Sequence, residues 1–120
     1  MEMKMTGRKA LVTGGSMGLG RAIAQAFSSA GAEVAIVARR ADVLAQTKAE
    51  IEAATGGRIV AVAGDVSTAE GCQAAWDAAI AELGQIDVLV NNAGSSHRAP
   101  FVEVTDCSPP SACAVWRSRG

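Results

Sequence analysis

The stretch ALVTGGSMGLGRAIAQAF, residues 10–27, decides the fold. A short apolar run breaks at a cluster of glycines and then resumes as an amphipathic pattern. The run Lys9–Thr13 predicts a buried strand. A strand, a glycine turn and a helix start in this order form an anion site, because the first helical N–H groups lack helical partners and lie at the positive end of the helix dipole. The spacing of apolar residues predicts the inner face of this helix: Leu19, Ala22, Ile23, Ala26, Phe27 and Ala30.

The remaining sequence continues this alternation of short apolar runs and amphipathic stretches. Strands are predicted over residues 33–38, 58–64 and 86–91, and helices over residues 42–54 and from a capping-box sequence at 67–70 to Gly84. Strands that alternate with helices indicate an α/β fold with a parallel sheet. The predicted inner faces of these two helices are Val43, Leu44, Thr47, Ile51 and Ala54, and Cys72, Trp76, Ala79, Ile80 and Leu83.

The connections between these elements predict which strand ends meet. Right-handed crossovers place the first two helices on one face of the sheet and the third on the other, which gives a doubly wound, incomplete sheet of order 3-2-1-4. Ligands bind outside the carboxyl ends of strands 1 and 4, at the switch point. Gly14–Gly20 and Asn91–Gly94 follow these strand ends. We expect the fourth strand to have a bare apolar edge and the chain to associate or to be poorly soluble.

The composition excludes several other classes of protein. The chain has 120 residues, 49% of them hydrophobic, which favours one folded domain. Its net charge of −1 gives no basis for nucleic-acid binding. No apolar run approaches the ~18 residues of a membrane span. Three cysteines without a C-x-x-C spacing suggest neither a disulfide framework nor a zinc site, and we expect a cytoplasmic protein without a metal.

Three motifs at the ends of predicted strands carry a family resemblance. They are T-G-x-x-x-G-x-G at Thr13–Gly20, the Gly-Asp-Val that ends at Val66, and N-N-A-G at Asn91–Gly94. Together with PFVEVT at residues 100–105, they resemble the N-terminal, cofactor-binding half of short-chain dehydrogenases/reductases over residues 9–106. The resemblance implies a Rossmann-like fold, NAD(P)-dependent hydride transfer between a nicotinamide and a carbonyl or alcohol substrate, and homo-oligomeric full-length relatives.

The glycines of the turn have separate predicted tasks. Gly14 allows the turn off the strand, Gly18 lets the backbone approach a phosphate, and Gly20 lets the helix lie close to the sheet. The alternative is that the glycines serve only the turn. By motif and by resemblance, the predicted cofactor-binding residues are Thr13, Gly14, Ser16, Met17, Gly18, Leu19, Gly20, Arg39, Arg40, Asp65, Val66, Asn91, Asn92, Ala93 and Gly94.

The end of the second predicted strand indicates which nicotinamide cofactor binds. A site selective for NAD places an acidic residue there, but this sequence has Ala38, followed by Arg39 and Arg40. A guanidinium matches a ribose 2′-phosphate in shape and charge, so NADP is favoured over NAD. Met17 stands where the family often has a second basic residue. The alternative is that the two arginines belong to an ordinary solvated loop.

The C-terminal part departs from the family. The resemblance implies a catalytic asparagine, a serine and a Tyr-x-x-x-Lys pair, but the chain has no tyrosine and its last lysine is Lys48. No catalytic residue is therefore assigned, and His97, the only histidine, is predicted to be solvated. Residues 1–106 are interpreted as a dinucleotide-binding half-domain and residues 107–120 as an atypical, disordered tail. A shifted reading frame from about Cys107 explains this ending, and a genuine short variant is the alternative.

Two functions remain open from the sequence. The first is an NADP-dependent oxidoreductase of the short-chain type that is truncated before its catalytic residues. The second is a non-catalytic fragment that only binds a dinucleotide.

Overall fold

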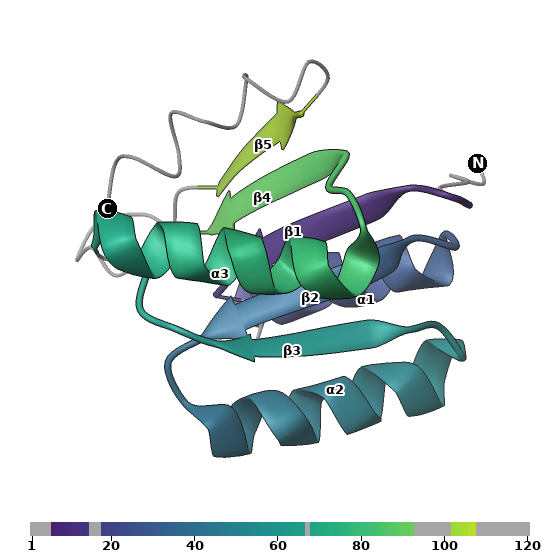
Figure 1. Ribbon diagram of the computed structural model, residues 1–120. Helices are drawn as coiled ribbons and strands as arrows, with labels where there is room; N and C mark the ends of the chain where they lie inside the picture. The colour runs from purple at the N-terminus through teal and green to yellow at the C-terminus, as the bar shows by residue number, and fades with distance from the viewer. Residues whose placement is uncertain (1–5, 15–17, 67, 93–101, 108–120) are drawn as a thin grey trace.

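The computed structural model describes residues 6–14, 18–66, 68–92 and 102–107. Figure 1 shows a twisted sheet with helices on both sides. From β1 to β4, strands and helices alternate as predicted, and their ends lie within two residues of the predicted ones. The elements are β1 (Lys9–Thr13), α1 (Gly18–Ser29), β2 (Glu33–Ala38), α2 (Ala41–Thr55), β3 (Ile59–Ala63), α3 (Ala69–Leu83), β4 (Val88–Asn92) and β5 (Val102–Asp106).

The order of the strands in the sheet is β3-β2-β1-β4-β5. The first four are parallel, so the predicted order 3-2-1-4 and the doubly wound fold are confirmed. The register places Thr13 of β1 opposite Val37 of β2 and opposite Asn91 of β4. The carboxyl ends of β1 and β4 therefore lie beside each other, which is the arrangement that a switch point requires.

The prediction that β4 forms a bare edge is wrong, because β5 pairs with it antiparallel. The register runs from Val88 opposite Asp106 to Asn92 opposite Val102. Pairing satisfies the backbone N–H and C=O groups along β4, and the β-branched residues of VEVTD suit a strand. Because β4 is paired along its length, it does not provide the bare apolar edge from which association of the chain was predicted.

The residue after β5 is part of the folded structure. Cys107, the first residue of the predicted tail, is buried, and its N–H donates to the carbonyl of Asp87 at 2.9 Å. Residues 108–120, which make up the rest of that tail, lie outside the described residues.

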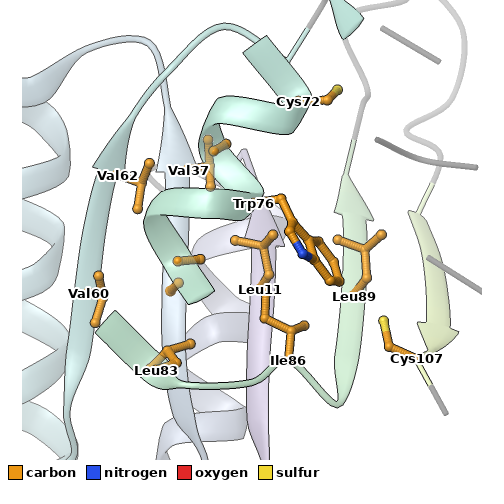
Figure 2. Close-up of a cluster of buried hydrophobic side chains, with 13 residues drawn as sticks. Leu11, Val37, Val60, Val62, Cys72, Trp76, Leu83, Ile86, Leu89 and Cys107 are labelled. Carbon is orange, nitrogen blue, oxygen red and sulfur yellow. The ribbon is translucent and has the colours of Figure 1, made fainter. Parts of the chain in front are cut away.

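The sheet separates two hydrophobic clusters. Alternate residues of the strands face α1 and α2 on one side, for example Val12 and Ile36, and α3 on the other, for example Leu11 and Val37. Figure 2 shows the second cluster, in which the Trp76 indole lies between α3 and the strands. Because helices cover both faces, the strands are apolar along most of their length. Among the described helices, none has the length and apolar character that a membrane crossing requires.

The predicted inner face of α1 is displaced by about one position. Small residues at 20, 24 and 28 are the buried ones, whereas Ile23 and Phe27 flank them half-buried. Leu19, Ala22 and Ala26 are exposed, contrary to the prediction. Small side chains let the helix axis approach the sheet closely, so the larger ones pack beside the contact line. In α2, Leu44, Thr47 and Ile51 are buried as predicted, but Ala54 is exposed.

The start of α3 also differs from the prediction. Thr68 is the N-cap, and its hydroxyl accepts a hydrogen bond from the Gly71 N–H at 3.0 Å. The capping-box sequence predicted the cap one residue earlier, at Ser67, which lies outside the described residues. Serine and threonine hydroxyls both suit an N-cap.

Candidate functional site

Two glycines, Gly14 and Gly18, border the predicted anion site between β1 and α1. Gly14 has φ +67° and Gly18 has φ +58°, a backbone conformation that favours glycine, and the Gly14 N–H donates to the Val37 carbonyl at 2.8 Å. The first turn of α1 contains no acidic residue, so no carboxylate opposes a phosphate at the positive end of the helix. The predicted site residues Ser16 and Met17 lie outside the described residues.

A buried hydroxyl joins the two strand ends at the switch point. Thr13 is 1% exposed, and its Oγ1 donates to Oδ1 of Asn91 at 3.1 Å. This hydrogen bond orients the Asn91 amide and joins the end of β1 to the end of β4. Asn92 is the last residue of β4, and the predicted residues Ala93 and Gly94 lie outside the described part of the chain.

Charged side chains follow the ends of β2 and β3. Arg39 and Asp65 lie side by side, with 3.9 Å between Nε and Oδ1, and both are well exposed. The Arg40 guanidinium instead lies 3.2 Å from Oδ2 of Asp42. A hydrogen bond from the Val43 N–H and the Arg40 guanidinium hold the pKa of Asp42 below its usual range. The structure thus separates the two arginines: Arg39 faces Asp65, and Arg40 faces the start of α2.

The remaining predicted residues lie around this same end of the sheet. Val66 is half-buried against the cluster that contains Trp76. Leu19, beside the glycine turn, is 49% exposed and is the one large hydrophobic side chain that the described residues leave exposed. Gly20 is buried in α1, as its predicted packing role requires. An exposed leucine at a helix start offers an apolar surface to a flat ring.

This arrangement is chemically suited to an extended ligand that carries several phosphate groups. The parallel strands β1 to β4 end at one edge of the sheet, so the glycine turn, Arg39, Asp65 and Asn91 share that edge. Backbone N–H groups at a helix start suit a pyrophosphate, an exposed guanidinium suits a further phosphate, and carboxylate and amide groups suit bases and riboses. The described residues contain no group of three His, Cys, Asp or Glu side chains able to hold a metal ion.

Sequence reasoning missed the contacts that support Asp65 and Val66. Gly71 and Cys72, in the first turn of α3, lie against the main chain of these two residues. The sequence identified Cys72 only as a core residue and assigned no role to Gly71. No local pattern reveals such a contact, because it depends on how the chain crosses from β3 to α3.

Known proteins resemble this chain in sequence and in structure. The sequence profile of the family described as short chain dehydrogenase matches residues 8–109. A short chain dehydrogenase of Pseudocercospora fijiensis is 43% identical over 100 residues, which are 83% of this chain and 32% of that protein. D-threitol dehydrogenase of Mycolicibacterium smegmatis is 41% identical over 107 residues, which are 87% of this chain and 40% of that protein.

A solved structure of a reductase also resembles this chain. L-sorbose reductase from Gluconobacter frateurii, complexed with NADPH and L-sorbose, matches with a TM-score of 0.76 at 38% identity. The match covers 82% of this chain and 38% of that one. The chain thus spans about a third to two fifths of the length of these relatives.

Proposed function

This chain belongs to the short chain dehydrogenase family, and from that premise we propose that it forms the dinucleotide-binding part of an oxidoreductase. The proposed reaction moves a hydride between a nicotinamide cofactor and a carbonyl or alcohol substrate. One observation carries the proposal: at the switch point, the Thr13–Asn91 hydrogen bond joins the end of β1, which Gly14 follows with a positive φ, to the end of the neighbouring strand β4. Dinucleotides bind at this place in doubly wound sheets.

Each part of the site has a proposed task. The glycine turn and the first N–H groups of α1 hold the pyrophosphate. Arg39 binds at the adenosine ribose, Asp65 and Val66 line the adenine, and Asn91 and its neighbours border the nicotinamide half. When bound, the cofactor supplies or accepts the hydride, and the protein orients it.

We propose NADP as the preferred cofactor. Arg39 follows β2, where a site selective for NAD would carry an acidic residue, and the residue at the end of β2 is Ala38. The guanidinium is exposed and thus accessible to a 2′-phosphate. Its ion pair with Asp65, at 3.9 Å between Nε and Oδ1, is weak because both groups are exposed to solvent. The Gluconobacter reductase, a structural relative, is complexed with NADPH.

A pair of matched glycine substitutions tests the proposal. Gly18 and Gly56 both have positive φ, +58° and +73°, and a side chain built at either meets nothing within 4 Å. Gly18→Asp and Gly56→Asp therefore impose similar backbone strain, but only the first places a carboxylate at the phosphate turn. Calorimetric titration with NADPH is expected to show binding to the 120-residue chain. The Gly18→Asp variant should lose this binding, and the Gly56→Asp variant should retain it. Equal losses in both variants would contradict the proposed site.

A further inference from the structure

We propose that Gly71 and Cys72 position the Asp65–Val66 segment and thereby set the adenine preference of the site. The inference rests on the proposed function, because it assigns Asp65 and Val66 to the adenine end of the cofactor. It adds two positioning residues on α3, an element that contributes no residue to the glycine turn or to the N-N-A-G motif.

Gly71 allows α3 to begin against the main chain of Asp65. A Cβ at this position would overlap the Asp65 carbonyl oxygen and lie 2.7 Å from its carbonyl carbon. The obstacle is main chain, so it cannot rotate away as the end of a flexible side chain does. Any larger residue at 71 must displace either the start of α3 or the Asp65–Val66 segment.

Cys72 holds the next peptide. Its Sγ donates to the Val66 carbonyl oxygen at 3.2 Å, and the side chain is 1% exposed. Two consecutive residues of one helical turn thus contact two consecutive carbonyl groups of the loop. The two contacts are of different kinds, one steric and one a hydrogen bond, and they fix the same segment.

The helix start that makes these contacts is itself well fixed. The Thr68 hydroxyl accepts from the Gly71 N–H at 3.0 Å, and the Cys72 N–H donates to the Thr68 carbonyl at 3.0 Å. At the other end of the loop, the Gly64 N–H donates to the Ala38 carbonyl at 2.9 Å. The segment is therefore held between the sheet and α3, two parts of the core.

The position of the segment decides where the Asp65 carboxylate lies. That carboxylate is next to Arg39, with 3.9 Å between Oδ1 and Nε. A carboxylate accepts a hydrogen bond from the 6-amino group of adenine, whereas hypoxanthine presents a carbonyl acceptor there and is repelled. A shift of the Asp65 main chain is thus expected to weaken the discrimination between these two bases.

The test uses NADPH and its hypoxanthine analogue as probes of the 120-residue chain. The wild type is expected to bind NADPH more tightly than the analogue. Gly71→Ala and Cys72→Val are expected to lower NADPH affinity about three- to tenfold, equivalent to one hydrogen bond, and to reduce the preference for adenine. Cys72→Ser, which keeps a donor, is expected to restore part of that preference. Ala74→Ser, an exposed change on the same helix, is the control and should change neither quantity.

A second measurement does not depend on the ligand. Amide hydrogen exchange in the free protein should become faster at residues 65 and 66 in Gly71→Ala and Cys72→Val, and remain unchanged in Ala74→Ser. If Gly71→Ala does not fold, the nearly isosteric Cys72→Val decides the question alone.

The outcomes separate this inference from the proposed function. A wild type that binds neither probe overturns both. A wild type that prefers adenine, together with folded Gly71 and Cys72 variants that keep the full preference and unchanged exchange, overturns the positioning role and leaves the proposed function standing.

Discussion

At the scale of single residues, we expect Arg39 to determine the preference of the site for NADPH over NADH. It stands apart from Arg40, which faces Asp42, and its guanidinium is exposed, as the proposed contact with a 2′-phosphate requires. A hydrogen bond to a charged group contributes about 1.5–3 kcal/mol, or on the order of ten- to a hundredfold in affinity. Arg39→Ala is expected to weaken NADPH binding by such a factor and to leave NADH binding nearly unchanged, as measured by calorimetric titration.

The neighbouring arginine provides the matched control for this experiment. Because Arg40 is paired with Asp42, Arg40→Ala is expected to have the smaller effect on NADPH. A loss that is equal for NADPH and NADH in Arg39→Ala would show that Arg39 does not bind the 2′-phosphate.

A second prediction for a single residue concerns Thr13, whose hydroxyl forms a hydrogen bond with the Asn91 side chain. Thr13→Val keeps the shape of the side chain but removes the donor to Asn91 Oδ1. We expect a loss of about 0.5–1.5 kcal/mol in the free energy of unfolding, measured with urea, together with weaker dinucleotide binding. Thr13→Ser keeps the hydroxyl and should retain the binding, although it loses a buried methyl group. Full NADPH affinity in Thr13→Val would show that the strand ends do not need this bond.

At the scale of the elements, a charged cluster ties the starts of the strands to the end of α3, at the edge of the sheet opposite the site. Lys9 Nζ at the start of β1 donates to the Leu83 carbonyl at 2.7 Å and pairs with Glu33 Oε2 at 2.9 Å. Arg58, just before β3, pairs with Glu33 at 3.0 Å and with Glu82 at 3.3 Å. The last turn of α3 has no basic residue of its own, so Lys9 supplies the positive charge there.

This cluster predicts a pH dependence of stability. Hydrogen bonds from Lys9 and then from Arg58 lower the pKa of Glu33 below its ordinary value of 4.5. The unfolded chain therefore takes up a proton at Glu33 first, and the stabilisation is present above pH 4.5 and is lost as the pH falls through the lower, folded pKa. Glu33→Gln is expected to lose about 0.2–1 kcal/mol at pH 7 and to show a smaller decline on acidification.

Urea unfolding at a series of pH values measures this effect. A double-mutant cycle with Lys9→Met provides the control, because the cost of Glu33→Gln should shrink once Lys9 is removed. If Glu33→Gln follows the wild-type pH profile throughout, the cluster does not contribute to acid sensitivity.

At the scale of the whole molecule, binding and catalysis are expected to separate. Reduction of a ketone needs a proton donor within hydrogen-bond reach of its oxygen, and general acid catalysis contributes about 10²–10⁴-fold. These 120 residues hold no tyrosine, the acid that the family resemblance implies. We expect the chain to bind NADPH and to oxidise no measurable NADPH with ketone substrates, in an assay at 340 nm.

A chimaera provides the positive control for this prediction. Replacing Cys107 onward with the matching second half of a family member should restore turnover. Steady ketone reduction by the unmodified chain, abolished by Gly18→Asp, would contradict the prediction and would direct attention to His97, which lies outside the described residues.

The sequence by itself determined the doubly wound core and the glycine turn. β1 to β4 appear where apolar runs predict them, because covered strands are apolar and glycines mark their ends. The order 3-2-1-4 followed from the handedness of crossovers, which leaves few arrangements open. Gly14 has a positive φ, as suits a glycine predicted to turn the chain off the strand. These features depend on residues close together in the sequence or on rules that hold for any chain.

Only the tertiary structure decided the contacts between distant segments. Helical spacing did not indicate that the small residues around Ala24 face the sheet, because that depends on how closely α1 approaches it. The pairing of β5 with β4 depends on an edge that no local pattern describes. The support of Asp65 by Gly71 requires α3 to start against the loop after β3. Such contacts are set by the space left when the elements pack together, and a local pattern is compatible with several ways of filling it.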